Sequence, residues 1–273
     1  MLLLAGMRLM GTMTSFFDAA GHPDGEHTLT VCGHVSEQEK WLKFETAWKR
    51  TLADVGIHGP FHMNHFMACQ QSFKGWLHRT DDRAALLRAL ISIIKRNVFK
   101  AFSETVLLDD WRRVNEVYQL EESHCTPYAL ASFYVIDRTI RWWGRRHRHD
   151  SMNQFVFEDG DEHKGDFIWI MDNLIRPRRR EFALISPIFK PKALVPLQAA
   201  DLAGWIERRA FKAWLIEQPE KSIPPTVIDA LLTLRNVPHL AGYLDKEKLI
   251  LFCENHAVPK RGDDRRWAGV VRR

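Results

Sequence analysis

The sequence predicts an α/β fold, with a mixed sheet flanked by helices. Three observations support this class. Two apolar runs are joined by the turn-rich segment GHPDGEH, which predicts a β-hairpin. Beyond the hairpin, apolar residues recur at steps of three and four, which is typical of a helix with one buried face. Strand-like and helix-like patterns then alternate, and this order is typical of α/β architecture.

The N-terminal elements follow from local patterns. The hairpin strands are predicted at residues 14–19 and 29–35. Ser36 and Glu39 then fit a capping box, because each side chain can satisfy a backbone amide at the start of a helix. This helix is expected to end near Gly56. Its predicted inward face comprises Trp41, Phe44, Trp48, Leu52 and Val55.

The rest of the chain is predicted to alternate between strands and helices, after an irregular, aromatic-rich stretch at 57–80. Strands are expected at 101–108, 154–158 and 182–189. Helices are expected at 81–100, 127–146, 164–175 and 197–215, with shorter ones at 224–236 and 245–256.

No internal repeat or clear linker divides the sequence, so we expect a single domain over residues 1–273. The opening residues are apolar but lack the basic start of a signal peptide. We interpret 1–12 as an N-terminal extension, with Met13 as an alternative start; a frayed terminus is the competing interpretation. Residues 222–273 are expected to form a C-terminal helical appendix and a basic tail.

Composition excludes several classes of protein. With 45% hydrophobic and 27% charged residues, the 273-residue chain is neither disordered, collagen-like nor a coiled coil. No apolar run reaches the ~20 residues that span a bilayer, so no membrane association is expected. The four cysteines form no C-x-x-C pair, which argues against a cysteine zinc site and favours reduced thiols in the cytoplasm. The net charge of +5 permits a polyanionic partner.

Three acidic residues stand out by their position. Asp18 ends the first apolar strand, Glu158 ends a later one, and Asp201 lies in a helix otherwise rich in Ala and Leu. Partly desolvated acids are costly unless they bind a cation or a donor, and carboxylate oxygens suit Mg²⁺ or Mn²⁺. The order of two strand acids and a helix acid favours one metal site. Taken singly, each acid could instead be a turn residue, a cap or the partner of an arginine.

Other polar residues are weaker candidates for a functional site. His62, three residues before His65, could assist a metal or contact a phosphate, although packed histidines are commoner. Lys164 could reach a phosphate as a point charge, or be an ordinary first-turn lysine. Asp161, close after Glu158, is a further candidate.

Two clusters of arginine suggest DNA or RNA as a partner. Their central residues are Arg145 and Arg146 in one cluster, and Arg178 and Arg179 in the other. Such side chains neutralise phosphates, and tryptophans beside the first cluster could stack on bases. The alternative is that they are helix ends favoured by the helix dipole. No P-loop and no G-x-S-x-G elbow is present, which argues against a P-loop nucleotidase and an α/β-hydrolase.

A series of short segments between about residues 14 and 210 carries a resemblance to a known family: SFFDAAG, TVCGHVSEQEKW, FHMNHF, FKGW, LLDDWRRVN, PYAL, FVFEDGDEHKGD and PLQAADLAGW. On these segments the chain resembles the bacterial and phage proteins of the domain of unknown function 3800 family, which are regarded as ribonuclease H-like. The resemblance implies a ribonuclease H-like mixed sheet with helical insertions. It implies that the family's strand acids correspond to Asp18 and Glu158, and that the family's pair of polar residues on a later helix corresponds to Gln198 and Asp201.

The chain departs from the family pattern at two places. Ala19 and Ala20 stand where many relatives carry a polar pair, and His65 stands where relatives often carry an acid. The three acids and the resemblance together lead us to expect a metal-dependent nuclease that hydrolyses phosphodiesters, with Mg²⁺ or Mn²⁺ held by the three acids, whereas Ala19 and Ala20 favour the alternative. The alternative is a catalytically inactive ribonuclease H-like module that binds nucleic acid or a protein partner, for example in phage defence.

Overall fold

A computed structural model describes residues 13–22, 27–144, 153–177, 185–216 and 223–262 of the chain. The expected N-terminal extension (1–12) and most of the basic tail (263–273) lie outside the described residues, as do all four arginines named above as nucleic-acid contacts.

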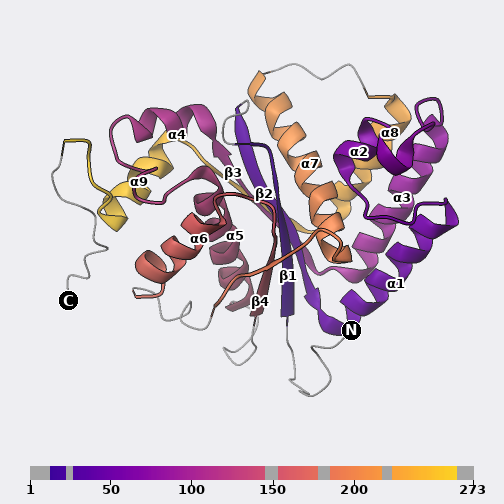
Figure 1. Cartoon of the computed structure of the whole chain (residues 1–273), viewed down its shortest axis with the longest axis horizontal. Coiled ribbons are helices and arrows are strands. Elements are labelled where there is room, and N and C mark those ends of the chain that lie inside the picture. Colours follow the sequence, from indigo (N-terminus) through magenta and orange to yellow (C-terminus); the bar gives the residue numbers. More distant parts are fainter. Residues whose placement is uncertain (1–12, 23–26, 145–152, 178–184, 217–222, 263–273) are drawn as a thin grey trace.

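The predicted hairpin is present and opens a mixed six-stranded sheet (Figure 1). The strands are β1 (Met13–Ala20), β2 (Thr28–Glu37), β3 (Lys100–Leu107), β4 (Asn153–Glu158), β5 (Ile188–Lys190) and β6 (His239–Leu244). Their order across the sheet is β5-β4-β1-β2-β3-β6. The first three strands are antiparallel to their neighbours in sequence. In contrast, β4 runs parallel to β1, β5 to β4, and β6 to β3.

Helices cover both faces of this sheet (Figure 1). On one face lies α7 (Val195–Ile216), with α1 (Gln38–Asp54), α2 (Met63–Met67), α3 (Thr80–Asn97) and α8 (Pro225–Leu232) beside or behind it. On the other lie α4 (Leu108–Asn115), α5 (Pro127–Gly144), α6 (Lys164–Ile170) and α9 (Lys246–His256), and a π-helical turn, Met171–Ile175, extends α6. The α/β class predicted from the sequence is therefore confirmed.

Each face of the sheet has its own buried core, because side chains alternate along a strand. Phe17 and Phe157 point to the α5 face, where they stack with ring centroids 5.3 Å apart. Phe16 and Val156 point to the α7 face. This alternation decides which way the acids that follow these residues point.

The predicted capping box is wrong. Helix α1 begins at Gln38 with Glu37 as its N-cap, and no side chain caps it. Ser36 remains within β2, where its hydroxyl donates a hydrogen bond to the carbonyl of Asn97. Glu39 pairs instead with Lys43, one helical turn on. Ser36, which the capping pattern assigned to the start of the helix, is therefore a strand residue.

The expected C-terminal helical appendix needs correction. Between α8 and α9 lies β6, which pairs with β3 over Ala101–Val106 and so completes the main sheet. Helix α9 packs on α4. The strand expected at 182–189 is also shorter, since only Ile188–Lys190 pairs and residues 182–184 lie outside the described part.

Within the described residues, no helix is both long and apolar enough to cross a membrane. All four cysteines are described and free: Cys32, Cys69, Cys125 and Cys253. This agrees with the expected reduced thiols.

Candidate metal centre

Asp18 and Glu158 lie side by side at the ends of two parallel strands. Phe17 pairs with Phe157 in the β1–β4 register, so the acids that follow them are neighbours across the ladder. Because Phe16 and Val156 both face α7, each acid two residues further on faces α7 as well. The expectation that the two strand acids occupy neighbouring parallel strands is confirmed.

Helix α7 brings the third acid to the same face. It packs directly on β1 and β2. Close approach is possible because Gly204 faces the strands: a Cβ there would lie 3.4 Å from the Ala20 Cβ and 3.6 Å from the Cys32 Cβ. A larger side chain at position 20 would occupy this space, so Ala20 matches the close approach of α7, whereas Ala19 packs on the opposite face of the sheet.

A lysine that the sequence analysis missed joins the acids. Lys192 lies in the connection between β5 and α7, and its Nζ is 2.9 Å from Asp18 Oδ2 and 3.5 Å from Asp201 Oδ1. The side chain of Lys192 is only 17% exposed, and those of the two aspartates are 3% and 13% exposed. The single ammonium is therefore shared by two nearly buried carboxylates and offsets part of their charge.

Burial dominates the electrostatics of this cluster. Burial, helped by the charges of Asp201 and Glu158, raises the pKa of Asp18 to about 7 even though the charge and hydrogen bond of Lys192 oppose the shift. Glu158 also has a raised pKa, chiefly because it is partly buried, with Lys192 again opposing. Burial alone would lower the pKa of Lys192, but Asp18 and Asp201 outweigh it and the pKa is raised. The lysine is consequently a firmly charged partner.

Gln198 and the residues around it fix this geometry. Its Oε1 accepts hydrogen bonds from Trp48 Nε1 at 2.9 Å and from the Phe61 backbone amide at 3.0 Å. Its Nε2 donates to the Lys192 carbonyl at 3.4 Å. The side chain of Gln198, a residue expected to be a possible accessory to the site, is thus engaged within the protein and holds the main chain at Lys192.

The FHMNHF segment supports Asp201. The backbone amide of Met63 donates to Asp201 Oδ2 at 2.7 Å, while the other carboxylate oxygen faces Lys192. His62 lies beside these groups: burial lowers its pKa, the charge of Lys192 lowers it further, and that of Asp201 opposes. Its ring centroid is 5.1 Å from that of His65. His62 is therefore close to the cluster, as a largely neutral imidazole.

Two other candidates have local partners. The Nζ of Lys164 is 2.5 Å from Asp159 Oδ1, so this lysine is paired at the loop after β4. Asp161 Oδ1 accepts a hydrogen bond from the backbone amide of His163 at 2.8 Å. Partial burial raises the pKa of Asp161 even so.

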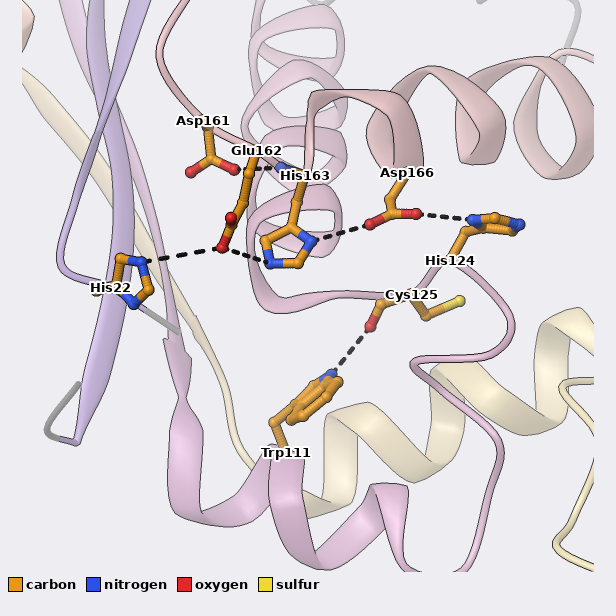
Figure 2. Close-up of polar contacts among 8 residues, drawn as sticks. All are labelled: His22, Trp111, His124, Cys125, Asp161, Glu162, His163 and Asp166. Carbon is orange, nitrogen blue, oxygen red and sulfur yellow. Dashed lines mark hydrogen bonds and ion pairs between the residues drawn. The ribbon is translucent and has the colours of Figure 1, made fainter. Parts of the chain in front are cut away.

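The loop after β4 packs against the Glu158 carboxylate through Gly160. A Cβ on Gly160 would lie 2.5 Å from Glu158 Oε2, so only glycine leaves room for the carboxylate as it stands. A chain of polar contacts ties the loop down (Figure 2). Glu162 pairs with His22, which follows β1, at 3.9 Å, and with His163 at 3.7 Å.

The polar chain continues through Asp166. Its carboxylate accepts from the Nδ1 atoms of His163 at 3.0 Å and His124 at 2.7 Å, if both carry their proton there (Figure 2). The His124 ring stacks on Trp169 with centroids 4.5 Å apart. The loop that carries Gly160 is therefore anchored to both β1 and the start of α5.

The three acids have the chemistry of a hard-cation site. Carboxylate oxygens are preferred ligands of Mg²⁺ and Mn²⁺, and a cation is already drawn to two of them, namely the ammonium of Lys192. As the side chains stand, no three His, Cys, Asp or Glu residues in the described part are grouped closely enough to hold a metal ion. To bind a metal ion, the Lys192 ammonium would have to leave Asp18 and Asp201, and the carboxylates of Asp18, Glu158 and Asp201 would have to point toward a common centre.

Comparison with known proteins gives no match among protein-family models and none among curated proteins. The resemblance therefore rests on the short motifs alone, and the site's function has to be argued from its geometry.

Proposed function

We propose that this chain is a ribonuclease H-like, divalent-metal-dependent nuclease that hydrolyses phosphodiester bonds. The observation that carries the proposal is that Asp18 and Asp201 share one nearly buried cation, Lys192, while Glu158 ends the strand beside Asp18 and lies within the field of the same charge. Support for the fold comes from three antiparallel strands continued by parallel ones, with helices on both faces. The four free cysteines agree with a cytoplasmic setting.

The residues of the cluster suit this chemistry. Asp18, Glu158 and Asp201 would hold Mg²⁺ or Mn²⁺, which supplies positive charge for the phosphate and acidity for an attacking water. In the reaction, water adds to phosphorus, the bridging P–O bond breaks, and the leaving oxygen gains a proton. The lowered pKa of His62 keeps its imidazole neutral at pH 7, so it can accept the proton of that water or orient it. The Met63 amide holds Asp201 in place throughout.

The proposed partner is DNA or RNA. Arg145, Arg146, Arg178 and Arg179 would contact its phosphates, in keeping with the positive net charge of the chain. Replacing all four with Gln should weaken binding and flatten its salt dependence, by about one unit of slope for each lost phosphate contact. Fluorescence anisotropy at several salt concentrations measures this, and an unchanged slope would remove these residues from the interface.

A specific observation also favours the alternative, a catalytically inactive module that binds nucleic acid or a protein partner. Lys192 already neutralises Asp18 and Asp201, and no metal-holding group is formed among the described side chains as they stand. In that case the acids and the lysine would be a buried ionic network that maintains the structure.

One experiment separates the two functions. Purified protein is incubated with single-stranded, double-stranded and branched nucleic acids, in Mg²⁺, Mn²⁺ or chelator. The nuclease should cleave at least one substrate with metal and none with chelator, and Asp201→Asn should abolish cleavage while the fold is retained. Asp172→Asn, which removes a carboxylate that pairs with Arg176, is the matched control and should cleave normally. Binding without cleavage under every condition would favour the inactive module.

A further inference from the structure

Lys192 occupies the position in which the acidic cluster would receive a cation. Its Nζ lies between Asp18 and Asp201, and its charge also acts on Glu158. Every acid of the proposed centre is therefore within the field of one ammonium group.

The main chain of Lys192 is anchored independently of the ion pairs that its ammonium makes with Asp18 and Asp201. The Lys192 carbonyl accepts from Gln198, which is in turn fixed by Trp48 and Phe61. Beyond the backbone, a lysine carries its charge on a flexible four-carbon stem, and a compact ammonium can leave a carboxylate without moving the main chain. The main chain of Lys192 can therefore stay in place while its ammonium changes position.

An ammonium and a divalent ion cannot both remain on the same carboxylate oxygens. Both are cations, they would lie within a few ångströms of each other, and in a partly buried site the repulsion at that distance is screened less than in bulk water. When a divalent ion arrives, the ammonium has to withdraw from Asp18 and Asp201. Until then, it removes the repulsion between the acids that burial would otherwise make costly.

We propose that Lys192 is a tethered cation that competes with the divalent metal for Asp18 and Asp201, and so sets how tightly this centre takes metal. The inference rests on the proposed function only for the identity of the metal. Its consequence is a centre whose negative charge is partly offset without metal and which binds metal more weakly than three free acids would.

The test compares Mn²⁺ binding in wild type, Lys192→Met and Lys192→Gln, by isothermal calorimetry, and the melting temperature with and without Mn²⁺. Both variants remove the competing charge, so we expect Mn²⁺ to bind about tenfold more tightly or better. In chelator, both should melt at a lower temperature than wild type, and Mn²⁺ should raise their melting temperature by more. Testing two neutral side chains keeps the comparison available if one variant folds poorly.

Two controls isolate the competing charge. Lys190→Met removes a positive charge from an exposed residue at the end of β5 and should leave Mn²⁺ affinity unchanged. Lys192→Arg keeps a cation on the acids and should bind Mn²⁺ no more tightly than wild type. Equal or weaker Mn²⁺ binding in both neutral variants would overturn the competition, as would the absence of Mn²⁺ binding in every protein tested.

The outcomes also separate this inference from the proposed function. Tighter Mn²⁺ binding in the neutral variants, with no nucleic acid cleaved by any protein, would refute the nuclease and leave the competition standing. Metal-dependent cleavage by wild type, with equal Mn²⁺ affinities in all variants, would support the nuclease and refute the competition by Lys192.

Discussion

Gln198 offers a sharp test of how the candidate centre is held, because one buried oxygen accepts two hydrogen bonds. Its Oε1 receives Trp48 Nε1 and the Phe61 amide, and the side chain is 3% exposed. Substitution by Leu keeps the volume similar but leaves both donors buried without an acceptor. Since a stranded buried donor costs about 1–3 kcal/mol, we expect Gln198→Leu to lower the free energy of unfolding by about 2–4 kcal/mol.

Urea denaturation followed by tryptophan fluorescence measures this loss, and a double-mutant cycle assigns it. Trp48→Phe removes one donor, so Gln198→Leu should cost about 1–2 kcal/mol less in that background than in wild type. The coupling follows from the 2.9 Å hydrogen bond alone and needs no assumption about function. A cost below about 1 kcal/mol, or a cycle with no coupling, would refute the reasoning.

Three further predictions test the site and the sheet. Gly160→Ala should move the Glu158 carboxylate, which the new Cβ would approach to 2.5 Å, so nucleolytic activity should fall severalfold while circular dichroism stays unchanged. Gly204→Ala, whose Cβ finds ordinary contacts, should be near neutral in thermal melts, whereas Gly204→Leu should cost about 1–3 kcal/mol by overpacking α7 against β1. Burial lowers the pKa of His34 from 6.5 to about 3. As the pH falls below 6.5, the unfolded state therefore binds a proton at this histidine before the folded state does, and the protein loses stability until the pH reaches about 3. Between pH 6.5 and pH 4, the free energy of unfolding from denaturation curves should therefore fall by a few kcal/mol less in His34→Leu than in wild type. Equal falls in the two proteins would contradict this.

The position of the strand acids could be predicted from sequence because strong local signals surround them. Phe16 and Phe17 before Asp18, and Val156 and Phe157 before Glu158, are apolar pairs that only buried strands accommodate. Two acids at the ends of such strands in an α/β chain meet when the strands are parallel neighbours.

Lys192 could not be found in the same way. It lies outside helix and strand, in a segment that also contains Lys190 and two prolines, and nothing in its neighbours marks it as buried. Its role depends on the β5–α7 connection folding back over β1, a tertiary contact with no local signature. The only available signal was a lysine close before the helix that carries Asp201.

Errors at the capping box and at β6 share one cause, which is that tertiary pairing decides the fate of a locally ambiguous segment. Ser36 continues β2 because it pairs with Thr14 of β1 and its hydroxyl donates a hydrogen bond to the Asn97 carbonyl. The residues of β6 are half-exposed and include Gly242, so they lack the alternation of a typical strand. Gly242 is required there, since a Cβ would overlap the Arg138 guanidinium that pairs with buried Glu104.

The late position of β6 in the chain has a consequence for synthesis of the protein. Strand β3 is flanked by β2 on one side, and in the described part of the chain its other side pairs with β6, His239–Leu244. A nascent chain that has reached α7 therefore carries an open strand edge, with backbone donors and acceptors that another chain can pair with. This long-range closure is slow to form, and the interval before it is when the nascent chain is most exposed to aggregation and to capture by chaperones.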